Sequence, residues 1–349
     1  MAVGIYDIGS YTFAPEAFFP RDLFERITET RVRDPDVVED EARRRQRRAH
    51  LAPDGRLVIL AADHPARYIT AVGDDPLLMG SRWGLLGRIL RVLTAPDVDG
   101  VMTTPDIMEE LFIVNRFVRE AGGRPFLDGR VLVGCTNRGG LAGTAFEMDD
   151  RMTAYTPERL AQMRLDGAKM MFRLDPSEPA CLDTIEACAR AIDRLYDLGI
   201  PAFVECLPVR KSEGRYTVLK SAPELVKVIG VATALGKSSL GTWLKVPYCE
   251  RYELVAQATT CPILMLGGEA RGDPTGLLIE LAAGMRAGAA IRGALVGRNV
   301  TFPGREDPRA VAAAVAGIVH RGWDAREALA ALPAQRGVQM DYFTSLPGR

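Results

Sequence analysis

Two acidic and two basic side chains interrupt apolar segments of the sequence, and their types could together do chemistry: Asp63, Lys169, Glu205 and Lys245. Ionisable side chains are rarely buried unless they are paired, so two acids and two amines at similar depth are expected to neutralise one another. For any one of them alone, a structural ion pair or an outward-pointing lysine is an equally good interpretation. The four together favour a catalytic cluster.

The apolar run Gly241-Thr-Trp-Leu-Lys-Val-Pro-Tyr248 should carry Lys245 into a dry interior. Burial disfavours the ammonium form and lowers the pKa of a lysine, and a second cation nearby lowers it further. A neutral amine can attack a ketone to give an iminium, which accepts electrons when a neighbouring carbon to carbon bond breaks. We therefore predict that Lys245 forms a Schiff base, and that Lys169 lowers the pKa of this amine and holds the substrate oxygen.

The two acids are expected to move protons around this amine. Glu205 can act as the proton shuttle during carbinolamine formation and at the enamine carbon, with a pKa raised toward neutrality by its apolar neighbours. Asp63 would bind or deprotonate the hydroxyl group whose carbonyl is released, although the roles of the two acids could be exchanged. His64 follows Asp63 and could assist proton transfer, or could be a packed structural residue.

Short apolar runs alternate with turn residues and helical patterns, as is typical of a parallel sheet with crossover helices. We count eight candidate strands: Leu57–Ala62, Gly100–Thr103, Val131–Gly134, Ala168–Arg173, Ala202–Leu207, Thr242–Val246, Ile263–Leu266 and Ile291–Val296. Eight such units predict an α/β fold, a single (β/α)8 TIM barrel. Enzymes of this architecture place their chemistry at the carboxyl ends of the strands, which is the rule that selects the four ionisable residues.

The ends of the last two strands supply a candidate phosphate site. Gly267 and Gly268 follow one strand, and Gly297 and Arg298 follow the next. Glycines allow backbone amides to approach a ligand closely, and phosphate sites of these barrels usually form at this position. Arg138, in the loop after the third strand, could hold a second anionic group or could belong to a mobile surface loop.

Two regions are expected along the chain. Residues 1–55 should form a helical extension packed on the barrel, with a helical pattern over residues 20–50, and residues 56–349 should form the barrel and its C-terminal helices, including one over Arg309–Arg321. The arginine-rich stretch over residues 43–48 could bind anions, but acidic residues precede it in a chain of balanced charge. A solvated helix face is the preferred interpretation.

Composition limits the class of partner. The 349 residues include 44 Lys and Arg against 45 Asp and Glu, a balance that indicates neither a nucleic acid nor a membrane surface, so a small molecule is expected. The 6 cysteines are scattered without a CxxC pair and should be reduced. The amino terminus lacks a signal-peptide pattern and no segment approaches the roughly 20 apolar residues that span a bilayer, which predicts a cytoplasmic protein.

Three segments, in this order and with similar spacing, resemble those of class I aldolases related to archaeal fructose-bisphosphate aldolase, deoxyribose-phosphate aldolase and tagatose-1,6-bisphosphate aldolase. They are Leu-Lys-Val-Pro-Tyr248, Cys-Pro-Ile-Leu-Met-Leu-Gly-Gly268 and Gly-Arg-Asn-Val300. The resemblance runs from about Leu57 to Val300. It implies a Schiff base on Lys245, no cofactor, and phosphate contacts from Gly267, Gly268, Gly297 and Arg298.

Within this family, the segments around Lys169 and Glu205 look like the tagatose-bisphosphate branch, whereas the fructose-bisphosphate branch carries a tyrosine near the place of Leu207. The extended N-terminus resembles an actinobacterial aldolase group of inositol breakdown. That resemblance implies 6-phospho-5-dehydro-2-deoxy-gluconate as the phosphosugar substrate, cleaved to dihydroxyacetone phosphate and malonate semialdehyde. Barrels of this kind often assemble, so a homo-oligomer is expected.

Several alternatives stay open at this point. The substrate could be a tagatose- or fructose-type bisphosphate. A zinc-dependent aldolase would need ligands, and the chain has only His50, His64 and His320, with no spacing that brings them together. A non-catalytic barrel could instead bind a sugar phosphate and signal its presence to a partner, because a fold does not imply a function.

Overall fold

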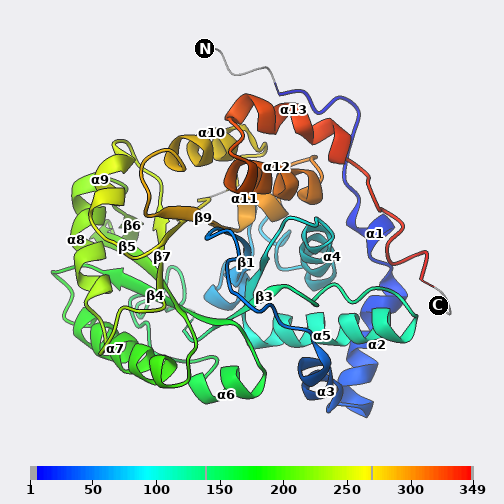
Figure 1. Cartoon of the computed structure of the whole chain (residues 1–349), viewed down its shortest axis with the longest axis horizontal. Helices are drawn as coiled ribbons and strands as arrows, with labels where there is room; N and C mark the ends of the chain where they lie inside the picture. The colour runs from blue at the N-terminus through cyan, green and yellow to red at the C-terminus, as the bar shows by residue number, and fades with distance from the viewer. Residues whose placement is uncertain (1–5, 138–139, 269, 347–349) are drawn as a thin grey trace.

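A closed parallel sheet lies at the centre of the computed structural model, which describes residues 6–137, 140–268 and 270–346 (Figure 1). Its strands are β1 (Leu57–Ala62), β2 (Gly100–Thr103), β3 (Val131–Cys135), β4 (Gly167–Leu174), β5 (Ala202–Ser212), β7 (Thr242–Pro247), β8 (Ile263–Leu266) and β9 (Ile291–Val296). Parallel pairing of β1 with β9 and of β4 with β5 closes the barrel. The predicted (β/α)8 fold is confirmed, and each predicted strand is present.

Helices cover the outside of the barrel (Figure 1). Those between strands and after β9 are α4 (Arg82–Leu93), α5 (Pro105–Glu120), α6 (Pro157–Gln162), α7 (Cys181–Asp197), α8 (Ala222–Thr233), α9 (Tyr252–Gln257), α10 (Thr275–Gly284), α11 (Arg298–Thr301), α12 (Pro308–Arg321) and α13 (Ala325–Gln335). Helix α12 confirms the predicted C-terminal helix. It begins at a proline, whose fixed φ suits the first turn, and Asp307 caps it by accepting a hydrogen bond from the Arg309 amide.

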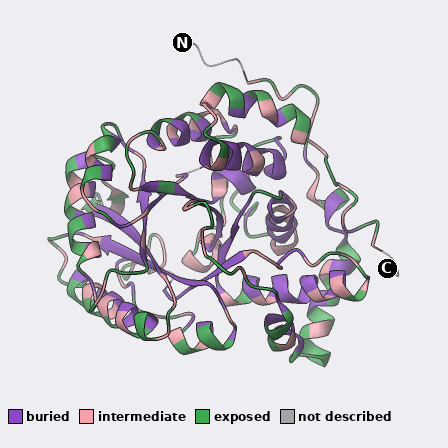
Figure 2. Cartoon of the chain, in the orientation of Figure 1, coloured by how far each residue is buried: buried purple, intermediate pink, exposed green. Residues whose placement is uncertain are grey.

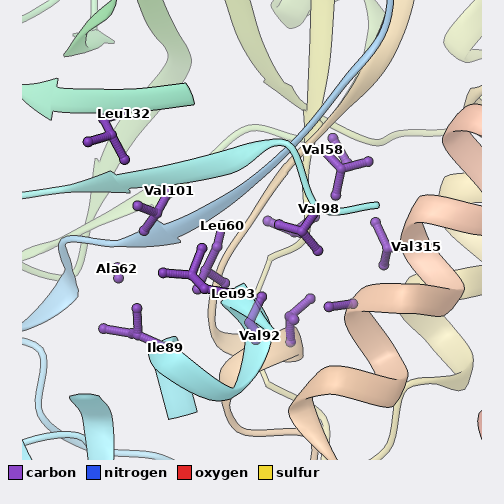
Figure 3. Packing of buried hydrophobic residues seen from close by; sticks show 14 of the residues in the cluster. Val58, Leu60, Ala62, Ile89, Val92, Leu93, Val98, Val101, Leu132 and Val315 are labelled. Atoms are coloured by element: carbon purple, nitrogen blue, oxygen red, sulfur yellow. The ribbon is translucent and has the colours of Figure 1, made fainter. Parts of the chain in front are cut away.

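The main hydrophobic core lies between the outer faces of the strands and the helices. Figure 2 shows the barrel strands buried along most of their length and the helices buried on the side that faces them. In one region of this core, Val58 and Leu60 of β1 share a cluster with Ile89 and Leu93 of α4 and with Val315 of α12 (Figure 3). Full burial of such side chains contributes about 1.5–3 kcal/mol each, so this layer holds the helices on the barrel.

A second, smaller layer fills the inside of the barrel. Phe203 of β5 stacks on Trp243 of β7 with ring centroids 6.0 Å apart, near the amino ends of these strands. Because side chains alternate between the two faces of a strand, the next inward positions are Glu205 and Lys245. The aromatic layer therefore forms a floor beneath the carboxyl ends, and the ionisable residues lie above it.

A hairpin that the apolar pattern did not predict extends β5 beyond the barrel. The strand continues past Leu207 to Ser212, turns at Glu213 and Gly214, and pairs antiparallel with β6 (Arg215–Val218). Both turn residues have positive φ, 50° and 78°, as a tight two-residue hairpin turn requires. The hairpin brings β6 and the residues that follow it to the mouth of the barrel.

Helices α1 (Pro15–Phe18), α2 (Arg21–Arg33) and α3 (Val37–Arg44) precede the barrel, and α2 and α3 pack on α5. The helical pattern predicted over residues 20–50 is wrong beyond Arg44, where the backbone leaves the helix. The remaining arginines of this stretch follow an irregular path under the amino ends of the barrel strands.

Arg43 and Arg44 are exposed on α3, as the preferred interpretation of a solvated helix face expects, but that interpretation is wrong for the arginines beyond the helix. Arg45 is buried, with Nη1 3.1 Å from Asp166 Oδ2. Arg48 Nη1 lies 2.7 Å from Asp99 Oδ1. Both carboxylates also accept hydrogen bonds from strand amides, so the charges fasten the chain to the base of the barrel. A sequence pattern could not show this, because both partners lie far along the chain.

Two further expectations concern the state of the cysteines and the presence of membrane-spanning segments. All of the cysteines are free and buried. Over the described ranges, no helix combines the length and apolar character that crossing a membrane requires.

Candidate active site

The structure brings the four ionisable residues together at the carboxyl ends of the strands. Lys169, Glu205 and Lys245 occupy inward positions of β4, β5 and β7. Asp63 follows the last residue of β1 and precedes the short 3-10 helix η1 (His64–Arg67). Glu205 is level with Lys245 in the register of β5 and β7, so two side chains that both point inward must meet.

The contacts form one continuous chain of charges. Glu205 Oε1 lies 2.8 Å from Lys245 Nζ, and Glu205 Oε2 lies 2.7 Å from Lys169 Nζ. Lys169 Nζ also donates a hydrogen bond of 3.0 Å to Asp63 Oδ2. The contact of Lys169 with Glu205 is an ion pair by distance but lacks hydrogen-bond geometry at Oε2. All four side chains are buried, Lys169 completely.

The surroundings shift the pKa values of the two lysines in opposite directions. Burial lowers the pKa of Lys245; Glu205 opposes this shift and the positive charge of Lys169 adds to it, which leaves the pKa below its ordinary value. Burial also acts to lower the pKa of Lys169, but the carboxylates of Asp63 and Glu205 outweigh it and raise that pKa. Lys169 is therefore held as a cation, and Lys245 is the amine that more readily loses its proton.

The pKa values of both acids are lowered, which corrects the expected shift at Glu205. Burial acts to raise the pKa of each carboxyl group, and Lys169 is the strongest opposing influence on both. Lys245 lowers the pKa of Glu205 further. The sequence showed the apolar neighbours of Glu205 but not two lysine nitrogens within 3 Å, and these decide the direction of its pKa shift. Both acids are thus carboxylates near neutral pH and can accept protons.

His64 faces the same site as a neutral imidazole. Burial lowers its pKa to about 3, with Asp63 opposing and Arg67 and Arg298 adding to the shift. His64 Nδ1 lies 4.0 Å from Asp63 Oδ1, beyond hydrogen-bond distance. The ring lines the cavity described next, so it can exchange hydrogen bonds with a ligand.

A cavity of about 160 Å³ lies above the charged cluster. Glu205, Lys245 and His64 line it together with the predicted phosphate contacts Gly267, Gly268, Gly297 and Arg298. A Cβ atom at position 297 would lie 2.7 Å from His64 Cε1, so only glycine fits between this ring and β9. The structure therefore brings the predicted phosphate residues to the same cavity as the predicted nucleophile.

Three further cations bear on the site, one of them predicted and two not. Arg138 lies outside the described residues. Arg67, at the end of η1, and Lys220, just after β6, also line the cavity. Sequence reasoning missed both, because neither lies at a strand end or in an apolar run. The four-residue spacing from Asp63 to Arg67 is the signal that could have indicated a cation at the mouth.

The three histidines considered as zinc ligands do not meet. His64 lies at the active-site cavity, whereas His50 and His320 line another cavity at the base of the barrel, where His320 pairs with Asp54 and Asp99. Across the described ranges, no group of three or more His, Cys, Asp or Glu side chains is arranged to hold a metal ion.

The sequence and the fold were compared with those of known proteins, and one protein family matches most of the chain. The family described as Cgl0159-like matches residues 55–318. The crystal structure of Cgl0159 from Corynebacterium glutamicum (Brevibacterium flavum) is 34% identical, with a TM-score of 0.80, over 86% of this chain and 98% of that chain. A comparison with curated proteins found no match.

More distant solved structures share the fold. A Schiff-base-forming fructose-1,6-bisphosphate aldolase is 21% identical, with a TM-score of 0.55, over 81% of this chain and 99% of that chain. A fructose-bisphosphate aldolase from Slackia heliotrinireducens is 14% identical, with a TM-score of 0.61, over 93% of this chain and 97% of that chain. At these identities the likeness shows the barrel fold alone.

Proposed function

The chain belongs to the Cgl0159-like family, and we propose that it is a class I aldolase, which cleaves a phosphorylated keto-sugar or keto-sugar acid through a Schiff base on Lys245. One observation carries the proposal. Of the two buried lysines that share Glu205, only Lys245 both lines the cavity and has a lowered pKa, while Lys169 is fully buried between two carboxylates. Such a pair matches the needs of an amine nucleophile and a fixed neighbouring cation.

Proton movements in the proposed cleavage fall to Glu205. The Lys245 nitrogen attacks the ketone carbon, and Glu205, 2.8 Å away, takes a proton from that nitrogen and delivers it to the former carbonyl oxygen, which gives the carbinolamine. A second proton, which Glu205 relays from solvent, lets the carbinolamine hydroxyl leave as water and gives the iminium. The iminium then accepts the electron pair of the breaking carbon to carbon bond, while a carboxylate removes the proton of the adjacent hydroxyl and the aldehyde departs. Protonation of the enamine carbon and hydrolysis release the ketone and restore the amine.

The two acids differ in their access to a substrate. Glu205 lines the cavity, whereas Asp63 is bound to Lys169. We assign the main proton shuttle to Glu205, and to Asp63 the fixing of Lys169 as a cation. An exchange of these roles would be revealed by a larger loss of turnover in Asp63→Asn than in Glu205→Gln.

For the substrate we propose 6-phospho-5-dehydro-2-deoxy-gluconate, cleaved to dihydroxyacetone phosphate and malonate semialdehyde. Support comes from a cavity that the three glycines and Arg298 line together with Lys245. The fold that the chain shares with fructose-1,6-bisphosphate aldolases makes a sugar bisphosphate the second candidate. Cleavage assays with both substrates separate the two.

Borohydride trapping tests the proposal directly. Reduction in the presence of dihydroxyacetone phosphate should inactivate the protein irreversibly, and peptide mass mapping should find the adduct on Lys245. Lys245→Met should lose turnover by at least about 10⁴-fold, because the covalent intermediate cannot form. Lys227→Met, on the exposed face of α8, is the matched control and should be trapped like the wild type.

Two outcomes would contradict this assignment. Full activity of Lys245→Met would show that Lys245 is not the nucleophile. Binding of a phosphosugar without turnover, with an affinity that Lys245→Met does not change, would favour a sensor. Activity that survives a chelator, together with borohydride inactivation, would separate this mechanism from that of a zinc-dependent aldolase.

A further inference from the structure

The backbone around Arg67 is held in place at the mouth of the cavity. The residue ends η1, and the following Tyr68 adopts a left-handed conformation (φ 68°) that turns the chain away. The Arg67 carbonyl accepts a hydrogen bond of 3.1 Å from the amide of Ala142, in the loop after β3. Backbone contacts on both sides therefore fix where this side chain starts.

The guanidinium group of Arg67 forms no ion pair with a carboxylate among the residues that the structure describes. Its Nη1 lies 3.5 Å from the thioether sulfur of Met171, a weak acceptor, and its buried Nε has no hydrogen-bond partner. Leaving a buried donor of a charged group unsatisfied is costly. The charge of Arg67 lowers the pKa of Asp63 and of Glu205, but both carboxylates form their ion pairs with lysines, and the described residues offer Arg67 no direct carboxylate contact. An anionic ligand in the cavity would accept a hydrogen bond from this guanidinium group and pair with its charge.

Arg67 follows β1, which is next to β9, but its guanidinium group reaches Met171 on the opposite side of the barrel from the predicted phosphate site. Met171, under the guanidinium group, belongs to β4, and Gly297 and Arg298 follow β9. Strands β4 and β9 are separated by the same number of steps in both directions round the sheet, so they lie on opposite sides. Lys245 lies on β7, midway between them along one of these paths.

From this arrangement we infer that Arg67 binds a second anionic group of the substrate, at the end of the carbon chain remote from the phosphate bound near Gly297. The inference rests on the proposed function, because the amine at the midpoint fixes the ketone. The substrate class is then a keto-sugar with an anion at each end and the ketone between them. Carboxylate and phosphate share the chemistry that a guanidinium group recognises.

The test measures condensation of dihydroxyacetone phosphate with three acceptor aldehydes. Malonate semialdehyde carries a carboxylate, glyceraldehyde 3-phosphate carries a phosphate, and glyceraldehyde is neutral. The wild type should prefer one charged acceptor over glyceraldehyde, and which one it prefers identifies the anion. Arg67→Gln should lower the ratio of kcat/KM for that acceptor to kcat/KM for glyceraldehyde by about 10- to 100-fold.

Two further variants keep the test decisive. Arg67→Lys keeps the charge without the bidentate fork and should lose part of the preference, even if Arg67→Gln fails to fold. Arg215→Gln, on the exposed face of β6, removes a cation outside the cavity and should leave the ratio unchanged.

Three results would overturn the inference. These are a wild type without preference for a charged acceptor, an Arg67→Gln variant that loses all three activities equally, and an Arg67→Lys variant that keeps the full preference. Borohydride trapping of Lys245 with dihydroxyacetone phosphate alone separates the two proposals. A trapped lysine with no effect of Arg67 on the ratio refutes only the second anion site, whereas absence of trapping refutes the aldolase and the site together.

Discussion

Two lysines within reach of one glutamate have pKa values shifted in opposite directions because their other partners differ. Lys169 lies between two carboxylates and is fully buried, so its ammonium form compensates both acids. Lys245 has one carboxylate partner and a cation beyond it, and it borders the cavity. In the proposed mechanism, Lys169 therefore serves as a fixed charge that makes its neighbour nucleophilic, without itself bonding to a substrate carbon.

Replacing this fixed charge should change the pH dependence of Schiff-base formation. In Lys169→Met the cation that lowers the pKa of Lys245 is gone, while both carboxylates remain. The pKa of Lys245 should rise, so the acid limb of borohydride trapping against pH should move to higher pH. Lys237→Met, an exposed lysine far from the cavity, is the control. An unchanged limb would show that Lys169 does not tune the amine.

Which residues form the site could be predicted, whereas their protonation could not. Strand alternation and the rule that chemistry lies at carboxyl ends are local patterns, and they selected Lys245 and Glu205 from the sequence. The pKa of Glu205 depends on distances to two lysines on other strands, which no local pattern contains. Arg67 was missed for a similar reason, because it reaches the cavity from a loop helix.

At the scale of elements, apolar runs predict that a strand exists better than where it ends. The strand predicted from Ala202 ends at Leu207, yet β5 continues to Ser212 because β6 supplies antiparallel partners. For the helices before the barrel, the predicted helical pattern is instead longer than the observed helix. The pattern continued past Arg44, but the arginines that follow leave the helix to pair with acids at the base of the barrel.

The inner layer of the barrel depends on a glycine in β4. A Cβ atom at Gly167 would lie 2.5 Å from Phe203 Cε2, so Gly167→Ala should displace the ring that forms the floor of the site. Such overpacking costs about 1–3 kcal/mol, which a lower urea midpoint would report. Gly230→Ala is the matched control, because that glycine lies in α8 with open space around it and should gain up to about 1 kcal/mol. Equal midpoints for both variants would contradict this view of the floor.

At the scale of the whole molecule, a buried acid joins both ends of the chain to the barrel. Asp307, which caps α12, forms a bidentate ion pair with Arg91 of α4 at 2.6 and 2.9 Å. The same carboxylate accepts hydrogen bonds from the Tyr11 hydroxyl and from the Gly337 amide. The N-terminal segment and the C-terminal tail then run along the same edge of the molecule, where Phe18 packs on Phe343 (Figure 1).

Asp307→Asn should therefore destabilise the whole protein and not only one terminus. Asparagine has the same shape but leaves the fully buried guanidinium of Arg91 without a compensating charge, a loss of about 3–5 kcal/mol for a buried pair. Chemical denaturation followed by tryptophan fluorescence should show a lower midpoint. The control is Glu186→Gln, which removes an exposed pair with Arg190 on α7 and should change stability by less than about 0.5 kcal/mol. If both variants unfold at the wild-type midpoint, the termini are held by their apolar contacts, and the buried charges add nothing to the stability of the barrel.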